Sequence, residues 1–503
     1  MGALEGLTLG FSVALTPGNL LAALVGATIG TFVGVLPGIG PLGAMALLLT
    51  ATLALDPVTS LIMLAGIYYG SLYGGSTTSI LVNVPGEAAS VVTAIDGYQM
   101  ARKGRAGAAL AIAAVGSFVA GTLGIVGLML FAPTLAAFAL RFSSPEYFAL
   151  ALLGLFALSR LSGGSFWKSL LSLSIGLALA TVGMDITSGT TRYTFDVVEL
   201  SQGIDLVPVV MGLFGVGEVL AVAERAGGLP HVTRVRFREL FPSRAEWRQA
   251  FPAVLRGTGV GFLIGLLPGP GGVLSTFASY GLERRITKRP EEFGHGAVEG
   301  VAGPESANNA ASSAAMVPLL ALGIPFSPIT ALLLAALVLQ GVQPGPLLMQ
   351  QRPDVFWGVV ASMYVGNVAL LILNFPLVGI WVSVLRIPQP VLVALILLFT
   401  LVGAYSINNS MLDLLVLIVM GVVGYVGKKL DFDLSPMVLG LVLGTMLEKT
   451  FHQTLYMSRG DVSVFFLRPI SGTLLAMLVV ILVGPTIWRL IRRRPVTARP
   501  ANP

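Results

Sequence analysis

Long stretches of this 503-residue chain contain no Asp, Glu, Lys, Arg or His. Several of these stretches are longer than the roughly 20 apolar residues that carry a helix across a bilayer. A porin-type barrel would instead show short strands in which apolar and polar residues alternate. The pattern therefore predicts an all-α polytopic membrane protein. The charge-free windows are 6–55, 57–86, 106–140, 257–282, 306–351, 355–385 and 387–412.

Proline and glycine interrupt these apolar stretches in two matching places. GTFVGVLPGIGP (30–41) and GFLIGLLPGPGG (261–272) have the same plan, and Pro268 follows Pro37 by 231 positions. In lipid, irregular backbone is tolerated only where it is buried in protein or lines a cavity. We therefore expect two re-entrant hairpins, at 18–55 and 249–283, whose tips lie near the membrane midplane.

Each hairpin precedes a second interrupted segment. YYGSLYGGSTTSILVNVPGEAAS (68–90) and GVAGPESANNAASSAAMVPLLALGIPFSP (300–328) both run from a small, polar stretch to a Val-Pro or Ile-Pro break. Proline removes a helical donor and clashes with the preceding turn. These segments are predicted to be broken helices, at 58–104 and 297–342.

Basic residues gather in four clusters that the positive-inside rule places in the cytoplasm. These are 102–105, 225–248, 284–289 and the tail 489–499. Between the first two clusters we expect an even number of crossings, near 106–132, 146–161, 169–183 and 206–222. The acidic loop 184–205 then faces outward. The later crossings are expected near 355–385, 388–402, 410–427, 434–447 and 470–488.

The duplication extends along most of the chain. Segment 141–165 resembles 386–410, and LVPVVMGL (206–213) resembles LSPMVLGL (434–441). Loop charges place Pro145 outside and its counterpart Pro390 inside, so the two repeats are predicted to have inverted topology. A chance likeness of apolar sequence would not give matched breaks in matched order. The predicted parts are an N-terminal segment (1–17), repeat 1 (18–222), a basic cytoplasmic linker (223–248), repeat 2 (249–447), and a final helix with a basic tail (448–503).

Two hairpin tips and two broken helices would form one binding site near the midplane. Half-helix N-termini suit a carboxylate, and carbonyl and hydroxyl oxygens can ligate Na⁺. For the glycines the alternative is close helix packing, and for the hydroxyls it is a bond to their own backbone. The candidate residues are Pro37, Gly38, Gly40, Ser76, Thr77, Thr78, Ser79, Asn83, Pro85, Gly86, Pro268, Gly269, Gly271, Asn308, Asn309, Ser312, Ser313 and Pro325.

Four carboxylates flank the broken segments: Glu87, Asp96, Glu299 and Glu305. Carboxylates inside a membrane are costly and often functional, so Glu87 or Glu305 could couple transport to protons or Na⁺. The alternative is that they cap half-helix N-termini. Neither motif contains an arginine, so an anionic solute would be held by N–H groups, hydroxyls and amides.

Composition supports this picture and excludes other classes. The chain is 55% hydrophobic and 11% charged, against roughly 25% charged residues in soluble domains. It has no cysteine, and its three histidines match no metal-ligand spacing. An enzyme would need a nucleophile with its base, or a metal, and neither is visible. A net charge of +6 reflects basic loops rather than nucleic-acid binding. The N-terminus lacks a basic n-region, so no cleaved signal peptide is expected.

The sequence also resembles the large permease subunit, of the TctA type, of tripartite tricarboxylate transporters. The resemblance covers nearly the whole chain. It is carried by GTFVGVLPGIGPLGAMALLL (30–49), LIMLAGIYYGSLYGGSTTSILVNVPGEAASVVTAIDGYQMARKGRAG (61–107) and RPEEFGHGAVEGVAGPESANNAASSAAMVPLLALGIP (289–325).

This resemblance implies a secondary transporter, or symporter, in the bacterial inner membrane. It would take up tricarboxylates or related carboxylates with a small membrane subunit and a periplasmic solute-binding protein, driven by a Na⁺ or H⁺ gradient. No other cofactor is expected. The alternative is a carboxylate channel or exporter that works without a binding protein. The hairpin and broken-helix plan is also similar to that of divalent-anion/sodium symporters.

One residue departs from the family pattern. Phe326 stands where glycine more often follows Ile-Pro. Its ring could narrow the site or stack on an aromatic carboxylate, or it could pack between helices.

Overall fold

The computed structural model describes residues 2–36, 40–161, 165–185, 188–224, 240–384 and 389–492. The protein is 81% helical, and the strands of the described chain are the short antiparallel pair β1 (Gly183–Met184) and β2 (Thr191–Arg192). The predicted all-α class is therefore confirmed. By length and composition, four of the described helical spans could cross a membrane: Pro17–Val35, Val91–Ala139, Pro353–Asn374 and Met411–Lys429.

In the first half, α2 and α3 lie in the region of the first predicted hairpin, and helices lie near each of the four crossings expected after the broken segment. The helices are α1 (Ala3–Ala14), α2 (Pro17–Val35), α3 (Gly40–Thr52), α4 (Pro57–Val82), α5 (Val91–Met100), η1 (Ala101–Arg105), α6 (Ala106–Ala139), α7 (Ser144–Leu161), α8 (Phe166–Ala180), η2 (Val198–Gln202), α9 (Leu206–Val210), η3 (Met211–Val216) and α10 (Gly217–Glu224).

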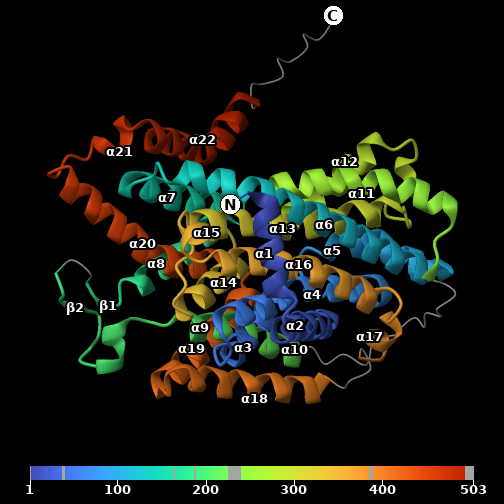
Figure 1. Cartoon of the computed structure of the whole chain (residues 1–503), viewed down its shortest axis with the longest axis horizontal. Coiled ribbons are helices and arrows are strands. Elements are labelled where there is room, and N and C mark those ends of the chain that lie inside the picture. Colours follow the sequence, from blue (N-terminus) through green and yellow to red (C-terminus); the bar gives the residue numbers. More distant parts are fainter. Residues whose placement is uncertain are drawn as a thin grey trace, which may run out of the picture.

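The second half runs from α11 to the C-terminal helix α22. Its helices are α11 (Arg244–Gly265), α12 (Gly271–Ile286), η5 (Pro290–Glu292), α13 (Glu299–Leu322), α14 (Pro328–Leu339), α15 (Leu348–Gln351), α16 (Pro353–Asn374), α17 (Val378–Val384), α18 (Gln389–Asn408), α19 (Met411–Lys429), α20 (Ser435–Met457), α21 (Val464–Leu467) and α22 (Pro469–Arg492). In Figure 1, α11 and α12 lie at the upper right beside α6 and α13, and α18 lies along the lower edge.

Both broken segments are interrupted at the expected prolines. α4 ends where Asn83 takes a left-handed conformation with φ 56°, and α5 begins at Val91. α13 ends at Gly323, with φ 71°, and α14 begins at Pro328 behind its cap Ser327. Pro85 and Pro325 lie in these two non-helical connections. The polar stretches before the breaks are helical, so most of their carbonyls accept helical hydrogen bonds and their side chains are the main groups free to bind a ligand.

Two helix pairs make very close backbone contacts through glycines spaced one turn apart. A Cβ added to Gly26, Gly30 or Gly34 of α2 would lie 2.3–2.4 Å from a carbonyl oxygen of α4. A Cβ added to Gly257, Gly261 or Gly265 of α11 would lie 2.1–2.4 Å from one of α13. The second set follows the first by 231 positions, the same spacing as Pro37 and Pro268. Small residues allow such approach in membrane proteins.

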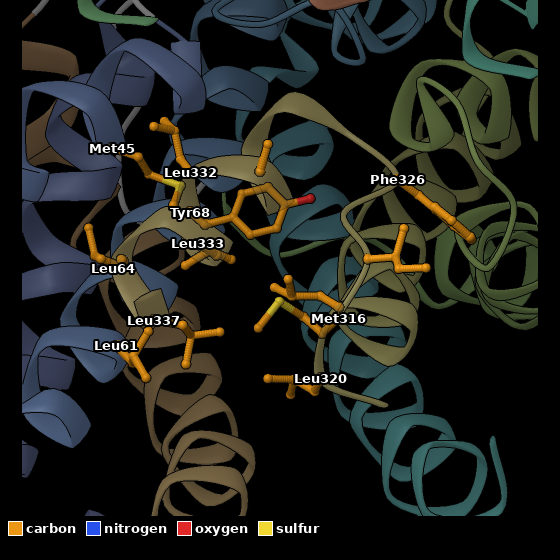
Figure 2. Close-up of a cluster of buried hydrophobic side chains, with 14 of the residues drawn as sticks. Met45, Leu61, Leu64, Tyr68, Met316, Leu320, Phe326, Leu332, Leu333 and Leu337 are labelled. Atoms are coloured by element: carbon orange, nitrogen blue, oxygen red, sulfur yellow. The ribbon is translucent and has the colours of Figure 1, made fainter. Parts of the chain in front are cut away.

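An apolar cluster fills the space where α3, α4, α13 and α14 meet (Figure 2). α4 contributes Leu61, Leu64 and Tyr68 to it, and Met45 of α3 is buried beside them. The remaining labelled side chains come from α13, α14 and the break between them: Met316, Leu320, Phe326, Leu332, Leu333 and Leu337. This packing holds the broken helices in place beside the polar residues described next.

Candidate functional site

The polar residues of α13 lie on one side of the helix and are deeply buried. Glu305, Asn308, Asn309 and Ser312 follow one another at helical spacing, so their side chains share a face. Each is at most 3% exposed. This face meets residues of α4, α5, α6 and the break between α4 and α5, all from the first half of the chain.

Glu305 is held by two hydroxyl groups from the first half. Ser76 Oγ of α4 donates to Glu305 Oε2 at 2.5 Å, and Thr93 Oγ1 of α5 donates to Glu305 Oε1. Both donors are neutral. Glu305 lies in the second turn of α13 and receives its bonds from other helices, so it does not cap a half-helix N-terminus. A buried carboxylate with neutral partners is well suited to take up a proton or bind a cation.

Glu87 lies in the break between α4 and α5 and reaches across to α13. Its Oε1 accepts a hydrogen bond of 2.7 Å from Asn308 Nδ2. Asn308 is one turn from Glu305 on the same helix, so the two carboxylates lie on neighbouring parts of one polar surface. Glu87 also belongs to a local turn, in which Ser90 Oγ donates to the Glu87 carbonyl oxygen at 2.9 Å.

The tip of the second hairpin lies against both breaks. The N–H of Gly269 donates to the Phe326 carbonyl oxygen at 3.1 Å. A Cβ added to Gly272 would lie 2.9 Å from Asn308 Oδ1 and 3.6 Å from Ala89 Cβ. α12 begins at Gly271 with no side-chain cap. The N–H of Gly271 donates to the Gly269 carbonyl oxygen at 2.8 Å. The next two N–H groups of α12, those of Gly272 and Val273, have no helical acceptor and are close to Asn308.

The first hairpin reaches the same region from the other half. Gly40 begins α3 with φ 63°, and a Cβ added to it would lie 3.9 Å from the Gly86 carbonyl oxygen. Gly86 itself is enclosed, because its own added Cβ would lie 2.4 Å from the Gly34 carbonyl oxygen and 2.6 Å from Gly75 Cα. The N-termini of α3 and α12 therefore both lie beside the segment 86–89. Helix N-termini carry partial positive charge.

Comparison with known proteins identifies the family of this chain. A model described as the tripartite tricarboxylate transporter TctA family matches residues 20–439, which include every candidate residue. The chain belongs to this family. It is therefore a component of a tripartite tricarboxylate transporter and a membrane protein, and the TctA family is a transporter family rather than an enzyme class.

Two proteins of Agrobacterium vitis are similar to this TctA-family chain. The uncharacterized 52.8 kDa protein of the TAR-I ttuC' 3' region is 50% identical over 481 residues, which span 95% of each chain. The uncharacterized protein of the TAR-II ttuC' 3' region is 49% identical over 217 residues, 43% of this chain and 90% of that protein. No solved structure matches the chain.

The TctA-family structure brings some candidate residues together and separates others. Ser76, Gly40, Gly86, Gly269, Gly271 and Asn308 lie at the convergence of tips and breaks. Pro85, Pro268 and Pro325 shape the backbone there. Pro37 and Gly38 lie outside the described residues. Thr77 is buried in α4, and Asn83 is the exposed residue that caps the C-terminus of that helix.

Several candidate hydroxyls bond to nearby backbone, as the alternative prediction held. Ser312 Oγ and Ser313 Oγ both donate to the Asn309 carbonyl oxygen, at 2.7 and 3.3 Å. Thr78 Oγ1 donates to the Gly75 carbonyl oxygen at 3.0 Å. Ser79 Oγ is buried without a hydrogen-bond partner in the described chain. Asn309 Nδ2 donates to Ser117 Oγ of α6 at 2.8 Å, which is a bond between helices.

Two residues of α5, Thr93 and Asp96, make contacts at the site that the sequence did not indicate. Thr93, which no motif singled out, bonds Glu305. Asp96, one turn later, accepts three backbone N–H bonds of 2.7–2.9 Å on Oδ1, from Gly294, Gly296 and Ala297. Its Oδ2 accepts from the Tyr280 hydroxyl at 2.9 Å. α5 is thus fixed to the residues before α13. The only sequence signal for Asp96 was that its carboxylate stands in an otherwise uncharged segment, and Thr93 had none.

Phe326 packs between helices. Its side chain is 7% exposed and belongs to the apolar cluster of Figure 2. A Cβ added to Gly154 of α7 would lie 3.6 Å from the Phe326 ring. The ring therefore lies against α7.

Proposed function

We propose that this chain is the permease subunit of its transporter and takes up a carboxylate solute by secondary active transport. The observation that carries the proposal is that two helix N-termini meet beside Asn308 and the segment 86–89. The N-terminus of α12 has no side-chain cap, and α3 begins at Gly40. N–H groups at helix N-termini bind carboxylates without a basic side chain. The amide of Asn308 adds a donor or an acceptor at the same place.

The coupling ion is assigned to Glu305, with Glu87 beside it. An ionised carboxylate at 1% exposure, bonded to neutral hydroxyls, lacks a compensating charge. A proton would remove its charge. A Na⁺ would be held by the carboxylate with hydroxyl oxygens such as those of Ser76 and Thr93. Either ion makes the neutral site easier to move across the membrane, which links solute movement to the ion gradient.

The finer architecture follows from the same residues. The matched glycine contacts of α2 with α4 and of α11 with α13 support two repeats of one plan. Loop charges support an inverted orientation of the two repeats, with the basic clusters on the cytoplasmic side of a bacterial inner membrane. The family name implies partner subunits, and we assign these to a small membrane subunit and a periplasmic binding protein that delivers the solute.

Uptake into proteoliposomes that contain the chain and both partner subunits tests this proposal. A panel of carboxylates is offered under a Na⁺ gradient, an H⁺ gradient and no gradient. We expect accumulation only with one of the gradients and with the binding protein present. Accumulation without a gradient, or with ATP alone, would overturn secondary transport. Gradient-free equilibration at the same rate without the binding protein would establish the channel or exporter alternative.

A further inference from the structure

A positively charged surface pocket lies apart from the transport site, beside the first half of α11. Its volume is about 590 Å³. Its lining from α11 is Ala245, Arg248, Gln249, Pro252 and Arg256, and Lys288 and Glu299 complete it. Three cations thus face one carboxylate, so the pocket attracts anions.

The cations of the pocket differ in what holds them. Arg256 is fixed, because its Nε and Nη2 donate to the buried carboxylate of Glu283 at 2.9 and 2.7 Å. Arg248 and Lys288 are exposed, and within the described chain no ion pair neutralises either of them. Because Glu283 offsets Arg256 and Glu299 offsets part of the remaining charge, the net positive charge of the pocket comes from Arg248 and Lys288. Their donors suit a phosphate group, whose oxygens accept several hydrogen bonds at once.

The same helix presents apolar side chains next to these cations. Phe251 is 54% exposed and Leu255 is 45% exposed. They are four residues apart and lie between Arg248 and Arg256 in the sequence, so both point outward from one stretch of α11. The charge-free window 257–282 begins directly after Arg256. The pocket therefore lies where the charged part of the hairpin meets its membrane-embedded part.

We propose that this pocket binds an anionic glycerophospholipid. The phosphate lies between Arg248 and Lys288, and the acyl chains cover Phe251 and Leu255. A hydroxyl-bearing headgroup such as that of phosphatidylglycerol can also donate to Glu299, whereas a choline headgroup cannot. Basic pockets beside membrane helices on the cytoplasmic side are suited to such lipids. The site would tie the base of the second hairpin to the membrane surface.

Native mass spectrometry of the full-length chain tests the proposal. Protein in detergent micelles is titrated with phosphatidylglycerol or phosphatidylcholine of the same acyl chains. We expect the wild type to retain phosphatidylglycerol preferentially. Each cation removed should weaken that retention roughly fivefold, so the pair Arg248→Gln and Lys288→Gln should weaken it about twenty-five-fold. Arg248→Lys keeps the charge and should retain most of the lipid, which separates loss of binding from loss of folding.

Two controls separate the lipid from other anions and from general basicity. Arg102→Gln removes an exposed basic charge that does not line the pocket, and should weaken retention far less than Arg248→Gln. Phe251→Ala should also weaken retention of phosphatidylglycerol, because the acyl chains are expected to cover this side chain. Equal retention of both lipids, or undiminished phosphatidylglycerol in the double variant, would overturn the proposal. Displacement of the lipid by millimolar inorganic phosphate would show a free-anion site instead, which also contradicts it.

Discussion

Asn308 of α13 donates a hydrogen bond of 2.7 Å to Glu87, which lies in the break between α4 and α5. The two residues come from different halves of the chain, 221 positions apart. This contact places an amide from one broken helix on a carboxylate at the break of the other. It also positions both residues beside the N-terminus of α12, where we expect the solute carboxylate.

Asn308→Ala should depress uptake strongly. The substitution removes a bond to a carboxylate and an amide beside Gly272, and hydrogen bonds to charged groups contribute about 1.5–3 kcal/mol. We therefore expect initial uptake in proteoliposomes to fall roughly tenfold or more at subsaturating solute, with normal membrane insertion. Ser312→Ala is the matched control, because that hydroxyl bonds only to backbone of its own helix. Equal uptake by both variants would place Asn308 among the packing residues.

Glu305→Gln should uncouple transport from its ion gradient. The amide keeps the size of the side chain but can neither take up a proton nor offer a charge to Na⁺. We expect gradient-driven accumulation to fall at least tenfold, while solute exchange between preloaded vesicles and the medium continues. Measuring both modes on the same vesicles checks this expectation. Full accumulation by the variant would remove Glu305 from the coupling role.

The hydroxyls that bond Glu305 give a finer test. Thr93→Val keeps the shape of the side chain and removes the donor, so it should change the ion concentration that gives half-maximal uptake by about threefold to tenfold. Thr93→Ser restores the hydroxyl and should restore the wild-type value. Ser76→Ala should act in the same direction as Thr93→Val. A change in maximal rate alone, with the ion dependence unaltered, would indicate a purely structural role.

Asp96→Asn should destabilise the fold. The wild-type carboxylate accepts three backbone N–H bonds on one oxygen and a hydroxyl bond on the other. The amide loses the charge that strengthens these bonds and offers a donor where an acceptor is needed, at a cost of about 2–4 kcal/mol. The midpoint of thermal unfolding in detergent should drop by several degrees. Glu291→Gln neutralises an exposed carboxylate three residues before Gly294 and should leave the midpoint unchanged.

Gly261→Ala should separate α11 from α13. The added Cβ would lie 2.1 Å from the Ala307 carbonyl oxygen, so the helices must move apart, at a cost of about 1–3 kcal/mol. Gly259→Ala is a control two residues away, where nothing lies within 4 Å of the added atom. It should be neutral or slightly stabilising, because alanine favours helix. Thermal unfolding of the two variants should therefore differ clearly. If Gly261→Ala were tolerated as well as Gly259→Ala, the close approach of α11 and α13 would be wrong.

The sequence predicted both breaks, at Pro85 and Pro325, from the local effect of proline on a helix. Proline alone does not end a helix in this fold, since Pro304 and Pro318 lie inside α13. The polar residues were harder to assign. Ser76 and Ser312 are both serines in small-residue helices and both lie within hydrogen-bond distance of their own backbone, yet only Ser76 also bonds Glu305. That difference depends on which helix faces them.

Contacts between distant segments explain what sequence reasoning missed. Thr93 became a partner of Glu305 only because α5 packs beside α13, 212 positions later. The glycines of α2 and α11 were visible as a repeat but not as a backbone contact, since their partners on α4 and α13 lie in separate segments. Inverted orientation and the assignment of the site residues stay predictions.

The fixation of α5 by Asp96 has a mechanical consequence. α5 belongs to the first half of the sequence, yet its carboxylate is bound to backbone that precedes α13. α6, the next helix, packs along α13 so closely that a Cβ added to Gly124 would lie 2.8 Å from Ser313 Cβ. α4, by contrast, reaches the Glu305 carboxylate of α13 through the side chain of Ser76. α5 and α6 are thus fastened to α13 of the second half, and residues 83–90 connect them to α4, which packs against α2 of the first half.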